Sequence, residues 1–275
     1  MKKKILFGLL FSFIGVSLFA QAGLRIIVEE NGGNLTIIRS QGRVRELVIP
    51  ETINDMPVTA IAEGAFTRRG LIMLSIPDSV VEIGNDAFSY NDISTLVIGD
   101  SVQTIGRSAF SNNRLNDLTI GSSVSSIGMG AFADNELTEL VLPDSVTVIE
   151  PYAFFNNRLR NLTIPDTVAT IGEGAFSSNL ISSVVIGNSV EAIGDGAFYN
   201  NRLTSISIPP SINTMGRRAF ESRITRRVSA PPINYFDEDG ELIFTTANDF
   251  DAYFVSTGSR PGIYTFSLDG WTFTE

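Results

Sequence analysis

The strongest constraint on this chain is a phenylalanine that returns every 22 residues. Eight phenylalanines share the spacing, and each follows an alanine: Phe66, Phe88, Phe110, Phe132, Phe154, Phe176, Phe198 and Phe220. Counted from each phenylalanine, aliphatic residues or methionine recur at +5, +8, +10, +14 and +17. A unit this small cannot close a core of its own, so it must bury these side chains against its neighbours. The sequence therefore predicts a solenoid with a repeated structural core.

The repeat favours strands over helices. At about 100° per residue the apolar positions scatter around a helical wheel, and proline or glycine stands at +11 of each unit. The pattern L-x-x-L-x-[IL], as in Leu115 to Ile120, alternates around +8 and +10 as a short strand does. We expect successive strands to stack in parallel, at about 4.8 Å per coil.

Polar residues and glycines also recur at fixed places. Aspartate, asparagine or serine at +12 and serine or threonine at +13 are predicted to bond the backbone of a turn. The glycine at +18 is predicted to take a positive φ. An asparagine column at +3 is predicted to satisfy backbone groups in a turn without a regular ladder. Its members are Asn91, Asn113, Asn135, Asn157, Asn179 and Asn201.

The unit L-x-x-L-x-I-[PG]-D-S-V-x-x-I-G-x-x-A-F-x-x-N resembles the BspA-like leucine-rich repeats of bacterial surface proteins. The I-P-D-S-V and I-G-x-x-A-F segments carry the resemblance over residues 45–230. It implies a leucine-rich-repeat solenoid of the α/β horseshoe class, dominated by β structure with short turns or 3-10 segments. Two departures are the asparagine at +3, where the family often has cysteine, and Ser123 and Ser145, where better-known leucine-rich repeats have asparagine. Curvature is therefore not transferred from those horseshoes.

The N-terminus has the features of an export signal. Lys2 to Lys4 form a positive segment, Ile5 to Phe19 form an uncharged apolar run, and Ala20 to Ala22 offer a cleavage site. The apolar run is short for a bilayer span, which needs about 20 residues. We expect residues 1–22 to be a signal peptide and the mature chain to have no membrane span. Export to the cell surface or the medium is predicted, with the periplasm as the alternative.

The solenoid is predicted to have a β-hairpin cap at each end. Residues 23–44 alternate around Asn31 to Asn34 and form the N-terminal cap, and residues 45–230 form the solenoid. Residues 231–275 form the C-terminal cap, with hairpin turns at Asp239-Gly240 and Asp269-Gly270. Caps of this kind cover the open ends of a stack.

Composition excludes several kinds of chemistry. The chain has no cysteine and no histidine, so disulfides, zinc ribbons, histidine metal cages and Ser-His-Asp triads are ruled out. All three lysines lie at positions 2 to 4, and removing them takes the formal net charge from −10 to −13. That balance argues against a nucleic-acid partner. Regular columns also distribute reactive side chains over many coils and do not gather them in one pocket. The sequence predicts no catalytic, metal-binding or cofactor-binding residue, and no enzyme.

Three charged features have a structural and a functional interpretation. The aspartates of the +12 column fit turn caps better than calcium ligands; they are Asp78, Asp100, Asp144 and Asp166. The acidic run 237–241 fits a turn better than a calcium loop. The arginine cluster between Arg217 and Arg227 fits packing against the acidic C-terminal cap better than an anion-binding patch.

The best candidate for protein binding is the outward side of the predicted strands, on the concave face of the solenoid. Its candidate contacts are Thr95, Asn116, Asp117, Thr119, Glu139, Val141, Arg160, Asn161 and Thr163. Repeat proteins bind macromolecules on such surfaces, but this stripe is small and polar and has no aromatic residue. A solvated sheet face without a ligand therefore remains an alternative. Tyr90, Tyr152 and Tyr199 are alternative contacts off the strands.

Two functions remain open. The resemblance favours an exported adhesion or interaction module whose partner is a host, matrix or envelope protein. The other interpretation is a structural periplasmic or envelope component that self-associates without a foreign ligand. The sequence identifies neither the partner nor the oligomeric state.

Overall fold

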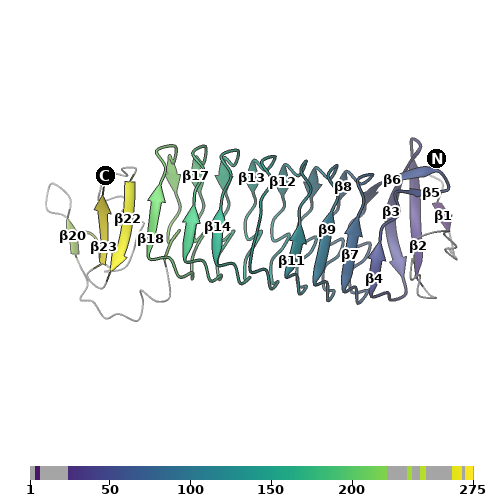
Figure 1. The fold of residues 1–275 in the computed structure, drawn as a ribbon, viewed down its shortest axis with the longest axis horizontal. Helices are drawn as coiled ribbons and strands as arrows, with labels where there is room; N and C mark the ends of the chain where they lie inside the picture. The colour runs from purple at the N-terminus through teal and green to yellow at the C-terminus, as the bar shows by residue number, and fades with distance from the viewer. Residues whose placement is uncertain are drawn as a thin grey trace.

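The computed structural model describes residues 4–6, 24–221, 234–236, 242–245, 262–267 and 270–274. Nearly all of the predicted signal peptide and much of the predicted C-terminal cap lie outside these residues. The described part contains strands and turns, with no α-helix or 3-10 helix. Its coils follow one another in a nearly straight row (Figure 1).

All regular coils but one contribute a strand to one side of the solenoid, as the L-x-x-L-x-[IL] pattern predicts. These strands pair in parallel with a register of one repeat, for example Leu96 with Leu118. We call their outward side the strand face. Its strands are β4 (Glu46–Val48), β7 (Met73–Ile76), β9 (Thr95–Ile98), β11 (Asp117–Thr119), β14 (Asn161–Thr163), β16 (Ser183–Val185) and β18 (Ser205–Ile208).

A second parallel sheet, which we call the back ladder, runs along another side of the same coils. It is built around the +17 aliphatic position, and Ile105 pairs in register with both Ile83 and Ile127. The sequence pattern gave no expectation of strands here. The ladder consists of β6 (Met56–Ile61), β8 (Glu82–Ile83), β10 (Thr104–Ile105), β12 (Ser126–Ile127), β13 (Val148–Ile149), β15 (Thr170–Ile171), β17 (Ala192–Ile193) and β19 (Thr214–Met215).

The strand face is interrupted most clearly in one coil. Residues 139–141 fit the strand pattern but form no strand, which separates the sheet β4-β7-β9-β11 from the pair β14-β16. The last strand of the face, β18, pairs with β22 and not with β16. Residues 138–142 make no backbone hydrogen bond to a neighbouring coil within the described part of the chain. Leu118 and Leu140 are only partly buried at this point, whereas the side chains at the same position of the other described coils are buried.

The predicted phenylalanine core is confirmed. The eight rings from Phe66 to Phe220 stack along the solenoid, with centroids of neighbours 5.1–5.4 Å apart and planes within 15° of parallel. All eight are at most 2% exposed. The preceding alanines are buried with them, and a larger side chain there would compete with the rings for space.

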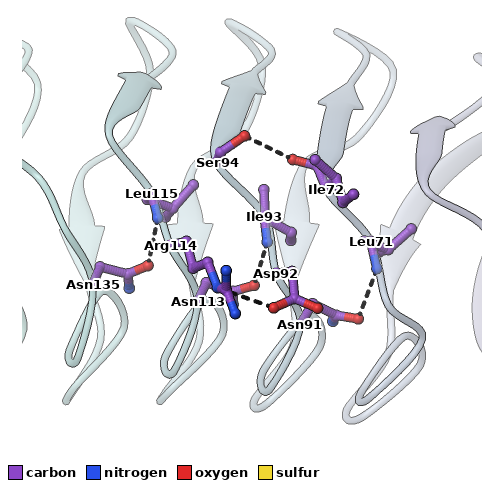
Figure 2. A network of polar contacts seen from close by, with 10 residues as sticks. All are labelled: Leu71, Ile72, Asn91, Asp92, Ile93, Ser94, Asn113, Arg114, Leu115 and Asn135. Carbon is purple, nitrogen blue, oxygen red and sulfur yellow. Dashed lines mark hydrogen bonds and ion pairs between the residues drawn. The ribbon is translucent and has the colours of Figure 1, made fainter.

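The asparagine column bonds the backbone as predicted. In one coil, Asn113 Oδ1 accepts from Ile93 N at 3.0 Å, while Asn113 Nδ2 donates to the carbonyls of Phe88 and Phe110 at 3.1 and 3.0 Å. Figure 2 shows the same amide-to-asparagine bond in successive coils. Each asparagine therefore satisfies buried groups of its own coil and of the preceding one.

The expected role of the +18 glycine is wrong. Gly106 and its equivalents do not take a positive φ; the positive values occur at +20 and +2, as in Ser108 (52°) and Asn112 (55°). Close approach of the coils explains the glycine instead. A Cβ on Gly106 would lie 2.6 Å from Asn85 N, inside the backbone of the preceding coil.

The N-terminal hairpin is present as predicted. Strands β2 (Arg25–Asn31) and β3 (Asn34–Gln41) pair antiparallel around Gly32 and Gly33, which have φ values of 61° and 84°. These values suit the tight turn of a two-residue hairpin. Strand β3 then pairs in parallel with β6, and β5 (Thr52–Ile53) pairs antiparallel with β6. Strand β1 (Lys4–Leu6) lies antiparallel to β2.

Strands continue beyond the last regular coil. Strands β20 (Asn234–Phe236) and β21 (Leu242–Thr245) pair antiparallel, as do β22 (Gly262–Ser267) and β23 (Gly270–Thr274). Both pairings agree with the predicted hairpins, although the turns themselves lie outside the described residues. Strand β22 adds antiparallel to β18, in the place that the strand of a further coil would occupy (Figure 1).

Candidate functional site

The strand face presents the predicted candidates to solvent. The middle residue of each short strand points into the core while its neighbours point outward, as in β14, where only Leu162 is buried. Thr95 is half-buried and the other eight predicted contacts are exposed. The solenoid thus brings them onto one side of the molecule, on both sides of the interruption and within it.

An apolar column within this stripe was not predicted. At +9, valine alternates with serine or threonine from coil to coil: Val48, Ser75, Val97, Thr119, Val141, Thr163, Val185 and Ser207. The four valines are 43–83% exposed, and Val141 is the most exposed of them. The sequence contains this alternation, but it becomes visible only when one outward position is compared across coils.

The interruption of the strand face leaves a hollow. Its volume is about 390 Å³, and its lining residues are Thr138, Glu139, Arg160 and Asn161. Three of the four are predicted contacts, so these candidates surround a real depression. With one acid, one arginine, one hydroxyl and one amide, the depression offers polar contacts of both charges to a ligand.

The three tyrosines lie off the strands. Tyr90 is 47% exposed, and the Arg68 guanidinium carbon lies 4.3 Å from its ring centroid. Tyr152 is 39% exposed, and its hydroxyl donates to Glu173 Oε1. This hydrogen bond, and then burial and the charges of Glu173 and Asp195, raise the pKa of Tyr152 above 10.0. Tyr199 is half-buried.

Three of the four +12 aspartates cap turns in the next coil. The amide of Asp100 donates to Asp78 Oδ1 at 2.7 Å, and the amide of Ser122 donates to Asp100 Oδ1 at 2.8 Å. Asp166 accepts in the same way from Asn188 N at 2.7 Å. These bonds support the turn-cap interpretation. Within the described residues, no three acidic side chains are grouped closely enough to hold a metal ion.

The arginine cluster is only partly described. Arg218 forms an ion pair with Glu221 at 2.9 Å, and Arg217 N donates to Asp195 Oδ1 at 2.7 Å. The remaining arginines of the cluster and the acidic run 237–241 lie outside the described residues. Packing of the cluster against the C-terminal cap therefore stays a prediction.

A charged column beside the strand face was also missed. At +4, Arg114 pairs with Asp92 and Arg158 pairs with Glu136, each arginine with an acid one coil earlier. As with the valines, the alternation is readable once the repeats are aligned, because each pair is 22 residues apart.

Across the part of the chain that the structure describes, no helix is long and apolar enough to cross a bilayer.

Comparison with solved structures gives leucine-rich-repeat proteins. A leucine rich cell surface protein from Faecalibacterium prausnitzii is 24% identical over 82% of this chain, with a TM-score of 0.50. A leucine-rich repeat protein from Bacteroides ovatus is 25% identical over 72% of this chain, with a TM-score of 0.58. This chain matches 59% and 61% of their respective lengths. A comparison with curated protein sequences gives no match.

The repeat itself identifies the family. The BspA type leucine rich repeat region matches residues 40–160 and 125–238, in six copies. These ranges cover the phenylalanine, asparagine and aliphatic columns described above. The chain therefore belongs to the BspA type leucine-rich-repeat family.

Proposed function

We propose that this chain is an exported, non-catalytic protein that binds other proteins through its strand face, at the cell surface or in the medium. The observation that carries the proposal is the column of exposed valines at +9. Val48, Val97 and Val185 stand on strands and Val141 lies in the coil between β11 and β14, so a valine faces outward at every second coil, beside polar residues that can set the register of a partner. The surface is extended and regular, as the binding surfaces of repeat proteins are.

The valines give such a surface a source of binding energy. Burying a valine side chain that was exposed contributes about 1.5–3 kcal/mol. Because Val97, Val141 and Val185 lie two coils apart, an extended partner running along the solenoid contacts them in turn. The intervening Thr119 and Thr163 supply hydroxyls for hydrogen bonds. This combination of apolar contacts and polar neighbours is typical of protein interfaces.

Export and a non-catalytic role have separate support. Export is supported by the positive segment, apolar run and cleavage site in residues 1–22 and by the resemblance to surface proteins; the similar Faecalibacterium protein is described as a cell surface protein. The non-catalytic role is supported by the absence of histidine and cysteine. The repetitive distribution of polar side chains along the solenoid also supports it.

Replacing the valines by threonine tests the strand face. The triple variant V97T/V141T/V185T removes the apolar column, and the fold tolerates the change because Thr119 and Thr163 already occupy the same position in other coils. Immobilised full-length protein is incubated with matrix and envelope proteins. We expect the triple variant to lose the partner that the wild type retains, while its thermal unfolding is unchanged. Retention of the same partner would overturn the proposal.

The envelope alternative is tested on intact cells. A surface protein is cleaved when protease is added outside, whereas a periplasmic protein is shielded by the outer membrane. Sedimentation of the purified chain over a range of concentrations then tests self-association. Shielding together with concentration-dependent association would favour the structural component over the adhesion module.

A further inference from the structure

A column of charged residues borders the strand face at the +4 position. Acids and arginines alternate along it, except at one coil: Asp92, Arg114, Glu136, Arg158, Leu180 and Arg202. Arg114 Nε lies 3.1 Å from Asp92 Oδ1, and Arg158 Nη1 lies 2.9 Å from Glu136 Oε2. Figure 2 shows the Arg114–Asp92 pair beside the strands, next to the asparagine column. Leu180 stands where the next acid of the series belongs.

A hollow surrounds this leucine. Its volume is about 920 Å³, and it is lined by residues 156–158, 178–180 and 200–202 of three successive coils. Leu180 is half-buried between Arg158 and Arg202, both of which are exposed. Coils rise by about 4.8 Å each, so the two arginine backbones are about 10 Å apart. Both guanidinium groups can reach a group placed over Leu180.

The two arginines have unequal partners. Arg158 pairs with Glu136 of the preceding coil, and Leu180 occupies the same position in the following coil. Arg202 forms no ion pair with any residue that the structure describes. Within the described residues, the hollow therefore combines Arg202, which has no ion-pair partner, Arg158, which has one, and the apolar side chain of Leu180.

We propose that this hollow binds a glutamate or aspartate side chain from an extended segment of a partner protein. The carboxylate lies over Leu180 between Arg158 and Arg202 and restores the alternation of charge along the column. The methylene groups of the acidic side chain pack on Leu180. Guanidinium groups suit this role because their planar forks of donors match a carboxylate.

The surroundings favour one acid within a mostly neutral peptide over a polyanion. Glu136 lies one coil beyond Arg158, and Asp134 Oδ1 accepts from Asn156 Nδ2 at 2.8 Å on the rim. A sulfated polysaccharide extending along the column would meet both carboxylates, and the chain as a whole carries a net charge of −10. A single carboxylate reaches the arginines without contacting these acids.

This site goes beyond the function proposed for the strand face. It lies off the valine column and assigns a ligand chemistry to residues that the strand-face proposal does not use. The V97T/V141T/V185T variant should therefore bind the acidic peptide as the wild type does. Failure of either proposal is then separable from failure of the other.

The experiment is an NMR titration of the full-length protein with a seven-residue peptide, acetyl-Gly-Ser-Thr-Glu-Thr-Ser-Gly-amide, followed through the arginine Nε–Hε signals. We expect the Arg158 and Arg202 signals to shift together. A peptide with glutamine in place of glutamate should bind about three- to tenfold more weakly, because exposed ion pairs are individually modest. Equal shifts with both peptides would overturn the proposal.

Three variants locate the site. R202Q should weaken peptide binding about three- to tenfold by removing one of the two arginines that contact the carboxylate. Leu180→Glu should weaken it at least as much, because its own carboxylate occupies the position between the arginines. The matched control is R114Q, which removes an arginine of the same column that already pairs with Asp92 and should leave binding unchanged. An equal loss in R114Q, or no loss in R202Q and Leu180→Glu, would contradict the assignment.

Heparin addresses the other ligand class. Its binding should be weaker than that of the acidic peptide and insensitive to Leu180→Glu. Tighter binding of heparin with the same dependence on Arg202 would replace the peptide by a sulfated polysaccharide as the ligand and overturn the proposal.

Discussion

The two sheets of this solenoid are built from the same coils but differ in strand length and in continuity. The back ladder has strands of only two residues in most coils, yet it continues without a break from β6 to β19. The strand face has longer strands but opens at residues 139–141. Continuity of the stack therefore does not depend on the sheet that the repeat pattern makes most obvious. It depends on the back ladder and on the buried columns beside it.

The buried columns also differ from the outward-facing columns, in how uniform their residues are from coil to coil. Phenylalanine fills every copy of its interior position, and asparagine fills six successive copies of the +3 position. The outward positions vary, and the +9 position alternates between valine and a hydroxyl residue. A buried position must fit both adjacent coils, whereas an outward position is free to vary. We infer that the inner columns hold the stack and the outer columns are available for binding.

The largest expected effect comes from the phenylalanine column. Phe132→Ala removes a fully buried ring that stacks between Phe110 and Phe154 at 5.3 Å on either side. We expect a loss of about 3–5 kcal/mol in the free energy of unfolding. Thr119→Ala, on the exposed strand face, should change it by less than about 0.5 kcal/mol. Urea denaturation measures both, and equal losses would refute the division into inner and outer columns.

The next largest loss in the free energy of unfolding is expected from the asparagine column. Asn113→Ala leaves the amide of Ile93 and the carbonyls of Phe88 and Phe110 without this partner. Each buried group left unsatisfied costs about 1–3 kcal/mol. The control is Asn116→Ala, which changes the same residue type at an exposed position three residues away. A loss for Asn113→Ala no larger than for Asn116→Ala would show that water replaces the asparagine.

A smaller loss in the free energy of unfolding is expected from substitutions where the coils approach most closely. Gly106→Ala places a Cβ 2.6 Å from the backbone of the preceding coil, and overpacking of this kind costs about 1–3 kcal/mol. Gly130→Ala tests the other reason for a glycine, because Gly130 has a φ of 62° with no atom nearer than 3.6 Å to the added Cβ. Its loss should be smaller, since Ser108 and Tyr152 take a positive φ at the same position in other coils.

The repeat made most of this fold predictable. A period that places Phe110 over Phe132 and Asn113 over Asn135 fixes which side chains stack and which backbone groups they meet, so the core, the parallel register and the turn caps followed from residue spacing. The error at Gly106 has a physical cause. A glycine in a turn suggests a special φ, whereas a requirement for close approach depends on a neighbouring coil 22 residues away.

The candidate site was predictable only in outline. The exposed strands followed from alternation, but the break at Val141 depends on how apolar side chains such as Leu118 and Leu140 pack between coils, which no local pattern reports. The hollow beside Leu180 was not predicted, because Leu180 stands out only when the +4 residues of all coils are compared. A leucine there is unremarkable until the acids and arginines of the other coils are placed beside it.

Hydrogen exchange compares the two sheets directly, within one coil. The amides of residues 139–142 make no backbone hydrogen bond to a neighbouring coil, whereas β13 in the same coil pairs with β12 and β15. We expect the former to exchange faster than the amides of β13, by a factor on the order of a hundred. Global stability is the same for both, so the difference reports local opening. Similar protection of both segments would mean that the strand face closes in solution.

The smallest expected effect lies on the outer surface, at Tyr152. Its neutral form is favoured in the folded state, because its hydroxyl donates to Glu173 and because the charges of Glu173 and Asp195 oppose ionisation, so its pKa is raised above 10.0. A group with a raised folded pKa contributes stability that is fully present below its unfolded pKa and is lost as the pH rises through the folded value. The free energy of unfolding should therefore decrease more steeply above about pH 10 in the wild type than in Tyr152→Phe.

The difference between the two proteins should be small, because Tyr152 is 39% exposed and solvent screens its interactions. Chemical denaturation of both proteins at about pH 8 and about pH 11 measures it. Parallel decreases would mean that the tyrosine–glutamate contact does not persist in solution and that this contact adds nothing to the stability that the inner columns provide.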